Sequence, residues 1–205
     1  MRAVPVKPPV TRLRTVANPA DPRYRRTRAQ ICDATRRLLE VTDVQRLTFG
    51  QVAAAADVNR STVHQHYGSR HELVADALAT DLAGLADALD RCPFDRSGGV
   101  PAELVEMFAA VEDQAAVLDR LSGTDRGLVG ARLTELLADR LADRFAAGVR
   151  PAGFDDVPPV EHARYLAAGL VQLLLLPPSG ASRPTPTQRA TRAWRLIAPV
   201  SSAVR

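Results

Sequence analysis

The sequence predicts an all-α protein, with a three-helix unit containing a helix-turn-helix at the N-terminal end and a longer helical part behind it. Alanine and leucine dominate its 205 residues, aromatic residues make up 4%, and isoleucine occurs only twice, which favours helices over strands. Apolar residues recur three and four positions apart through most of the chain, as they do on one face of a helix. Capping signals and prolines separate these stretches, so we expect several helices.

An apolar stripe, a capping box and a short turn predict the three N-terminal helices. The first helix is expected over residues 23–41. Its stripe consists of Ile31, Ala34, Leu38 and Val41. The capping box Thr48–Gln51 opens a short second helix. A turn over residues 57–59 leads to a third helix over residues 60–67, for which Asn59 is the expected N-cap.

The chain behind Gly68 is also predicted to be helical. A second capping box, Ser69–Glu72, opens a long helix that is expected to end near Arg91. Further helices are expected between prolines, glycines and a third capping box, over residues 101–121, 125–149, 160–176 and 186–197.

Charge is distributed unevenly along the chain. Residues 1–75 carry 13 basic and 6 acidic side chains, whereas residues 76–205 carry 14 basic and 17 acidic ones. A basic front next to a mildly acidic remainder favours contact between the N-terminal part and a polyanion. We therefore divide the chain into a flexible, proline-rich basic arm over residues 1–22, a helix-turn-helix DNA-binding domain over residues 23–75, and a helical domain over residues 76–205.

The predicted third helix has the polar outer face that a recognition helix requires. In a helix-turn-helix the second short helix enters the major groove, so its exposed side chains must reach base edges. The polar residues of this helix are Arg60, Ser61, Thr62, Gln65 and His66. Arg60 is the best candidate for reading guanine, because its guanidinium can donate to both O6 and N7.

The segment from residue 52 to residue 73 resembles the DNA-binding segment of the tetracycline-repressor-like (TetR) family of transcriptional regulators. The residues that match the family pattern are Val52, Ala53, Val58, Thr62, Val63, Tyr67, Ser69 and Leu73. The resemblance covers roughly residues 23–78, and the chain length also fits this family. The sequence departs from the pattern at three positions, since Asp57 replaces the turn glycine, His64 replaces a tyrosine and Arg70 replaces a lysine.

The resemblance implies two kinds of DNA contact. The residues that would face bases are Arg60, Ser61, Thr62 and Gln65. The residues that would hold phosphates are Thr48, His64, His66, Tyr67 and Arg70. Thr48 and Ser61 are equally suited to helix capping, and capping can coexist with contact to a phosphate. Thr62 and Tyr67 have the alternative of packing inside the three-helix unit.

The resemblance also implies that the C-terminal helices bind a ligand and form a homodimer. The most apolar helices, over residues 160–176 and 186–197, would form a four-helix bundle between subunits, with Leu170 and Leu174 at its centre. The core of a monomer is the alternative for these helices. Side chains that could line an effector pocket are Met107, Phe108, Phe145 and Tyr165. Plain core packing explains each of them equally well.

The predicted function is therefore a ligand-responsive repressor that binds double-stranded DNA at a palindromic operator in the cytoplasm, without a membrane partner. No catalytic role is expected, because neither a nucleophile elbow nor a glycine-rich phosphate loop is present. No metal or cofactor is expected either. Cys32 and Cys92 cannot build a structural zinc site, and His64, His66 and His71 fall on different helix faces or helices.

Two alternatives come from other functional classes. One is a small all-helical enzyme or ligand-binding protein that retains a helix-turn-helix shape. The other is a nonspecific basic DNA-packaging protein. The polar outer face over residues 60–66 argues against an enzyme, which has no need to keep it.

Overall fold

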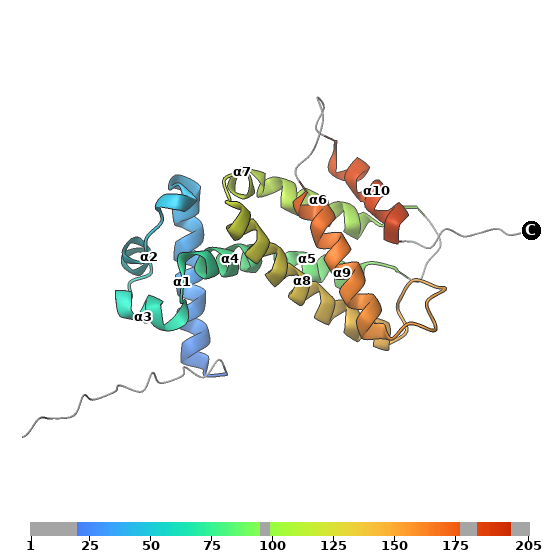
Figure 1. Ribbon diagram of the computed structural model, residues 1–205, viewed down its shortest axis with the longest axis horizontal. Coiled ribbons are helices and arrows are strands. Elements are labelled where there is room, and N and C mark those ends of the chain that lie inside the picture. Colours follow the sequence, from blue (N-terminus) through green and yellow to red (C-terminus); the bar gives the residue numbers. More distant parts are fainter. Residues whose placement is uncertain (1–19, 95–98, 177–183, 198–205) are drawn as a thin grey trace, which may run out of the picture.

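The computed structural model describes residues 20–94, 99–176 and 184–197, and these ranges contain helices and no strand (Figure 1). The N-terminal helices are α1 (Pro22–Val41), the 3-10 helix η1 (Val44–Arg46), α2 (Phe49–Ala55) and α3 (Arg60–His66). The remaining helices are α4 (Arg70–Asp81), α5 (Gly84–Arg91), α6 (Ala102–Asp113), α7 (Ala115–Leu118), α8 (Gly123–Ala146), α9 (Pro159–Leu175) and α10 (Pro186–Ile197). The all-α class, with a helix-turn-helix domain followed by a helical domain, is confirmed. The predicted arm lies outside the described residues except at its end, where Pro22 already begins α1.

The short helices α2 and α3 are held at the angle of a helix-turn-helix by one backbone feature and a few apolar contacts. Asp57 adopts the left-handed conformation, with φ of 52°, at the position where the family pattern has glycine. Val52 and Val63 are fully buried and fix the two helices on the core. Asn59 is the N-cap of α3 as predicted, although its side chain makes no capping hydrogen bond.

The apolar face of α1 differs from the predicted stripe at its C-terminal end. Ile31 and Ala34 are buried as expected, but Val41 is 82% exposed and Leu38 is only half-buried. Leu39 takes the core position instead. The helix ends at Val41 and the chain turns away at Thr42, whose backbone is extended. The last predicted stripe position therefore has no neighbouring helix to cover it.

The long helix predicted from Ser69 to Arg91 is divided into α4 and α5. Ser69 caps α4 by accepting a hydrogen bond from the Glu72 N–H at 3.2 Å, while the Glu72 carboxylate accepts from the Gly68 N–H at 2.9 Å. The break occurs beside Gly84, a poor helix former, where 3-10-type turns replace the regular α-helical bonds. The predicted leucine stripe survives the break, because all four of its leucines are buried: Leu78, Leu82, Leu85 and Leu89.

The second predicted long helix, over residues 101–121, is also divided, into α6 and α7. Gln114 ends α6 with a non-helical backbone and at the same time precedes α7. The resulting bend brings Arg120 close to α1, where its guanidinium donates to the Leu39 carbonyl at 2.6 Å.

The helices α4 and α8 join the two parts of the molecule. α4 packs against α1 on one side and α8 on the other, and α8 also packs against α5 and α9 (Figure 1). α6 packs against α5 and α10. One continuous apolar core runs from Ile31 to Ile197. The predicted boundary between residues 75 and 76 falls inside α4, a helix that both parts share. In the described ranges, no helix is both long and apolar enough to cross a membrane.

Candidate nucleic-acid interface

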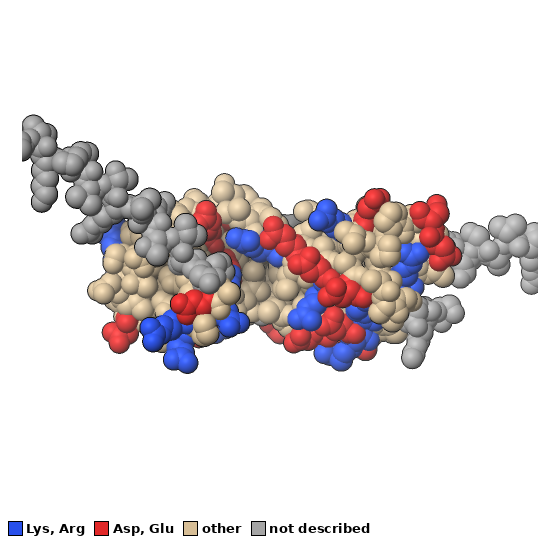
Figure 2. Space-filling view, turned by 90° about the horizontal axis from the view of Figure 1, so that it is seen from below, with Lys and Arg blue, Asp and Glu red and all other residues tan. Residues whose placement is uncertain are grey.

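The helix α3 presents the polar face that the sequence predicted. Val63 points inward and is fully buried, whereas Arg60, Ser61, His64 and Gln65 are exposed and Thr62 is half-buried. In Figure 2 arginine side chains gather at one edge of the helix-turn-helix end, and a row of acidic side chains crosses the C-terminal helices. This face can meet a polyanion and place several hydrogen-bonding groups on it.

Thr48 and His64 lie on the neighbouring surface formed by α2 and α3. Thr48 completes the predicted capping box, because its hydroxyl accepts from the Gln51 N–H at 3.3 Å and its own N–H donates to Gln51 Oε1 at 2.9 Å. The His64 ring stands edge-on to Phe49, with 4.7 Å between the ring centroids, and stays exposed. Both side chains are therefore accessible beside the outer face of α3.

Tyr67 is buried, and its hydroxyl has an internal partner. Only 5% of the residue is exposed, and its hydroxyl donates to Asp76 Oδ2 at 2.5 Å while lying 3.2 Å from Cys32 Sγ. Asp76 also accepts two hydrogen bonds from the Arg28 guanidinium. Burial works against the Asp76 charge, but the bonds from Arg28 and Tyr67 hold the pKa of the carboxyl below its ordinary value. In this arrangement Tyr67 ties α3 to α1 and α4.

His66 also has an internal contact. Its ring stacks on Tyr24 with 4.2 Å between the centroids, and its Nδ1 is buried without a hydrogen-bond partner. Burial, and to a lesser extent the charge of Arg28, lower the pKa of His66. This environment therefore disfavours the charged form of the ring.

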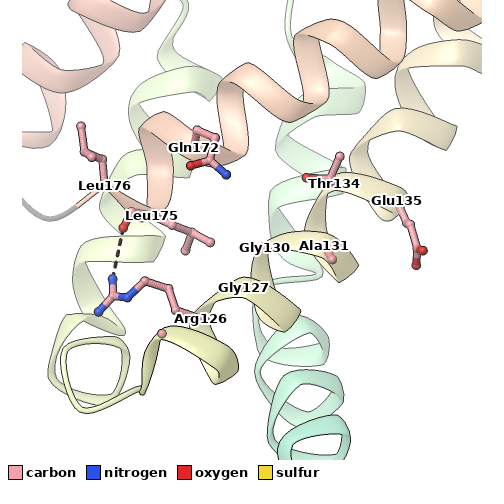
Figure 3. A pocket seen from close by; sticks show the side chains of 10 residues that line it. Arg126, Gly127, Gly130, Ala131, Thr134, Glu135, Gln172, Leu175 and Leu176 are labelled. Carbon is pink, nitrogen blue, oxygen red and sulfur yellow. Dashed lines mark hydrogen bonds between the residues drawn. The ribbon is translucent and has the colours of Figure 1, made fainter.

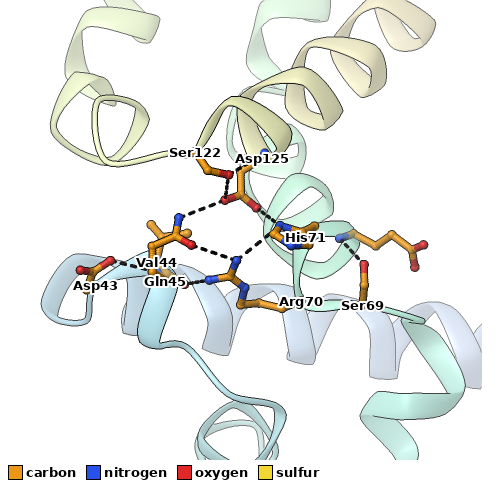
Figure 4. A network of polar contacts seen from close by, with 9 residues as sticks. Asp43, Val44, Gln45, Ser69, Arg70, His71, Ser122 and Asp125 are labelled. Atoms are coloured by element: carbon orange, nitrogen blue, oxygen red, sulfur yellow. Dashed lines mark hydrogen bonds and ion pairs between the residues drawn. The ribbon is translucent and has the colours of Figure 1, made fainter.

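Arg70 reaches back to η1 (Figure 4). Its guanidinium donates to the Val44 carbonyl at 2.6 Å and to Gln45 Oε1 at 3.2 Å. Of the nine predicted DNA contacts, the structure thus places five on one accessible surface and leaves Thr62 half-buried beside them. The five accessible residues are Thr48, Arg60, Ser61, His64 and Gln65. His66, Tyr67 and Arg70 instead make contacts within the protein.

The residues predicted to line an effector pocket do not share one environment. Met107, Phe108 and Phe145 are buried in the core of the C-terminal helices, while Tyr165 is 76% exposed. A cavity of about 690 Å³ lies elsewhere, between the first half of α8 and the end of α9 (Figure 3). Small residues such as Gly127 and Gly130 form one wall, and none of the four predicted residues lines it.

Four apolar side chains on or directly after α9 and on α10 are exposed. Val160, Tyr165, Leu176 and Leu196 are all more than half exposed. Leu170 and Leu174, expected at the centre of a subunit interface, are instead 2% and 1% exposed within this single chain. That expectation was wrong, because helices of the same chain already bury both side chains.

Sequence reasoning missed a group of polar residues that joins η1 and α4 to α8. The group contains a carboxylate, Asp125, with no exposed surface, and the ring of His71, whose Nδ1 lies 2.6 Å from it. The two residues are 54 positions apart, and no local pattern links them. The sequence suggests no role for His71 other than metal binding, which its separation from His64 and His66 argues against. Among the described residues, no three His, Cys, Asp or Glu side chains come together as metal ligands would.

Comparison with known proteins agrees with this geometry. Residues 31–77 match the family of bacterial regulatory proteins described as the tetR family. The fold is similar to that of the TetR family repressor AlkX from a Dietzia species, with a TM-score of 0.53 and 20% identity over 89% of this chain and 96% of that one. It is also similar to Thermus thermophilus FadR, a TetR family repressor solved in complex with lauroyl-CoA. For FadR the TM-score is 0.51 and the identity 20%, over 83% of this chain and 92% of that one.

No curated protein is similar enough to count as a match. The likeness to the two solved structures concerns the fold. The family match over residues 31–77 confirms the resemblance to the TetR family and indicates a DNA-binding regulator.

Proposed function

Because residues 31–77 carry the signature of the TetR family and the chain has the fold of TetR family repressors, we propose that the protein is a sequence-specific transcriptional repressor. The observation that carries this proposal is the outer face of α3, where Arg60, Ser61 and Gln65 are exposed while Val63 is fully buried. An enzyme gains nothing from such a face. We assign the protein no catalytic activity and place its action in the cytoplasm.

The proposed binding mode follows from the placement of these side chains. α3 lies in the major groove, Arg60 reads a guanine, and Ser61, Thr62 and Gln65 contact neighbouring base edges. Thr48 and His64 lie at the phosphates on the edge of the groove. Each base contact discriminates by only about 1–3 kcal/mol, so one copy of α3 cannot reach the specificity of an operator.

A homodimer on a palindromic operator supplies the missing specificity. Two copies of α3 would then occupy half-sites about 34–36 Å apart, or somewhat further. The exposed apolar side chains Tyr165 on α9 and Leu196 on α10 support an interface there, because such side chains are candidates for contact with a partner.

We further propose that a small-molecule effector controls this binding through the C-terminal helices. Met107, Phe108, Phe145 and Tyr165 stay the residues proposed to contact the effector, although the first three are buried in the core and Tyr165 is 76% exposed. Lauroyl-CoA is a suitable first probe, since a repressor of similar fold was solved with it. Trp194 is the single tryptophan and is buried on α10, so its fluorescence reports binding in this part of the molecule.

The decisive experiment measures the affinity of the wild type and of Arg60→Ala for DNA from upstream of the protein's own gene and for random DNA. Arg60→Ala should weaken specific binding by about 1–3 kcal/mol and change random binding far less. Arg140→Ala, which removes an equal charge from an exposed site on α8, is the matched control and should leave specificity unchanged. Equal losses on both DNAs with Arg60→Ala would contradict the proposed reading.

A further inference from the structure

The start of α8 is connected to the helix-turn-helix domain by a set of polar side chains that we call the α4–α8 network (Figure 4). Its members are Gln45 on η1, Arg70 and His71 at the start of α4, and Ser122 and Asp125 at the start of α8. These residues come from three separate stretches of the sequence. The network lies where the two parts of the molecule meet.

Asp125 is the centre of the network. Its carboxylate has no exposed surface and accepts from Ser122 Oγ at 2.6 Å, from His71 Nδ1 at 2.6 Å and from Gln45 Nε2 at 3.4 Å. Burial disfavours its charge, but the hydrogen bonds from Ser122 and His71 hold the pKa of Asp125 below its ordinary value. Because an ionised carboxylate only accepts, the Nδ1 of His71 must carry the proton.

The contacts continue from Asp125 to the backbone of η1. Gln45 donates to Asp125 through Nε2 and accepts from Arg70 through Oε1. Arg70 in turn donates to the Val44 carbonyl at 2.6 Å. The first turn of α8 therefore holds both η1, which leads directly into α2, and the first turn of α4, which directly follows α3.

The hydrogen bonds of the α4–α8 network restrict the relative orientation of the helices more than apolar packing alone does. Apolar contacts between α4 and α8 bring the helices together but tolerate small rotations, whereas hydrogen bonds to a buried carboxylate are satisfied in a narrow range of orientations. Leaving Asp125 without its partners would be costly, because an unpaired buried charge is strongly destabilising. One relative orientation of α2 and α3 to α8 is thereby favoured.

We propose that Asp125 and His71 are positioning residues of the DNA-binding surface, which fix the angle between the helix-turn-helix domain and the C-terminal helices. This inference rests on the proposed function for its consequence at the operator. In a dimer both copies of α3 must match the spacing of the half-sites at once. If the angle between the helix-turn-helix domain and the C-terminal helices varies, the protein therefore loses more affinity for the operator than for random DNA.

The first test compares His71 variants in DNA binding. His71→Ala removes the donor to Asp125, whereas His71→Asn keeps a donor near the position of Nδ1. We expect His71→Ala to weaken operator binding about tenfold with little change on random DNA, and His71→Asn to restore most of the loss. Asp90→Ala is the matched control, since it breaks an exposed ion pair of 3.2 Å between α5 and Arg140 of α8 and should leave affinity unchanged.

The second test measures the orientation itself and needs no DNA. Spin labels at Ser61→Cys on α3 and Asp139→Cys on α8, both exposed positions, give one distance within a chain when the protein is diluted with unlabelled copies. Cys32 and Cys92 are buried and stay unlabelled. The distance distribution should be narrow in the wild type and in His71→Asn, and clearly broader in His71→Ala.

These measurements separate the two proposals. An unchanged distribution in folded His71→Ala overturns the positioning role, whatever the DNA result. If the wild type binds no specific DNA but His71→Ala still broadens the distance distribution, the repressor function is contradicted and the positioning role is supported. If His71→Ala does not fold, Gln45→Ala removes an exposed member of the same network and should broaden the distribution to a smaller degree.

Discussion

His162 on α9 is a buried histidine whose protonation the fold disfavours. It is 3% exposed and lies between Phe145 and Phe154, with ring centroids 5.0 and 4.2 Å away. Neither of its ring nitrogens has a hydrogen-bond partner. Burial, and then the charge of Arg150, lower the pKa of His162.

This environment predicts that stability falls in mild acid. The unfolded chain binds a proton at this histidine near its ordinary pKa of about 6.5, whereas the folded chain binds one only at lower pH. The stability contribution is therefore complete above about pH 6.5 and is lost as the pH falls below that value, towards the lowered folded pKa. His66, whose pKa is also lowered, adds to the same loss.

The free energy of unfolding in urea at pH 8 and at pH 5.5 measures this effect. His162→Phe should lose less stability between the two pH values than the wild type, and should cost little or nothing at pH 8, because it removes unsatisfied nitrogens from an aromatic site. His64→Ala removes an exposed histidine and is the control. A pH dependence that is identical in His162→Phe and the wild type would show that this ring does not titrate on unfolding.

At the scale of elements, α2 and α10 begin with the same capping box. Thr48 and Gln51 exchange bonds of 2.9 and 3.3 Å, and Thr185 and Gln188 exchange bonds of 3.0 and 3.2 Å. Both threonines are exposed. Only Thr48 lies beside α3. A comparison of the two threonines therefore distinguishes the effect of helix capping from the effect of contact with a phosphate.

The prediction compares the two alanine substitutions. Thr48→Ala and Thr185→Ala should each lower the free energy of unfolding by about 1 kcal/mol, because each removes one capping acceptor. Only Thr48→Ala should also weaken DNA binding, on operator and random sequences alike. Urea unfolding and mobility-shift titrations measure the two effects. Should both variants bind DNA equally well, Thr48 serves as a cap alone.

At the scale of the whole molecule, the proposed assembly depends on the exposed apolar side chains of α9 and α10. Tyr165 and Leu196 are 76% and 71% exposed, so changes there do not disturb the core of the single chain. Leu170 and Leu174 would not serve this purpose, because they are buried within the chain and a charge there would unfold it.

Tyr165→Glu and Leu196→Glu should therefore give folded monomers. A carboxylate buried between subunits without a partner should weaken dimerisation by about 3 kcal/mol or more, roughly a hundredfold, and operator binding should fall with it. Sedimentation at micromolar concentration measures the assembly. Val41→Glu, an equally exposed apolar position on α1, is the control and should leave a dimer. Finding dimers with both glutamate variants would place the interface elsewhere.

The sequence by itself determined the fold class, the starts of α2, α3 and α10, and the polar face of α3. These features depend on signals between neighbours in the chain, such as a capping box or the spacing of Val63 from Arg60. Such signals act over one or two helical turns, and they are the same whatever packs around them. The left-handed backbone at Asp57 is not among these signals, because its place was indicated only by the glycine of the family pattern.

Only the tertiary structure decided which side chains of that region remain free for a ligand. Tyr67 and Arg70 have the residue types of phosphate contacts, yet Asp76 and the Val44 carbonyl occupy them. Periodicity likewise indicated that α9 is apolar, but not that Leu170 faces inward while Tyr165 faces out. The physical reason is that spacing tells which residues share a face of a helix, whereas the neighbour of that face comes from a distant part of the chain.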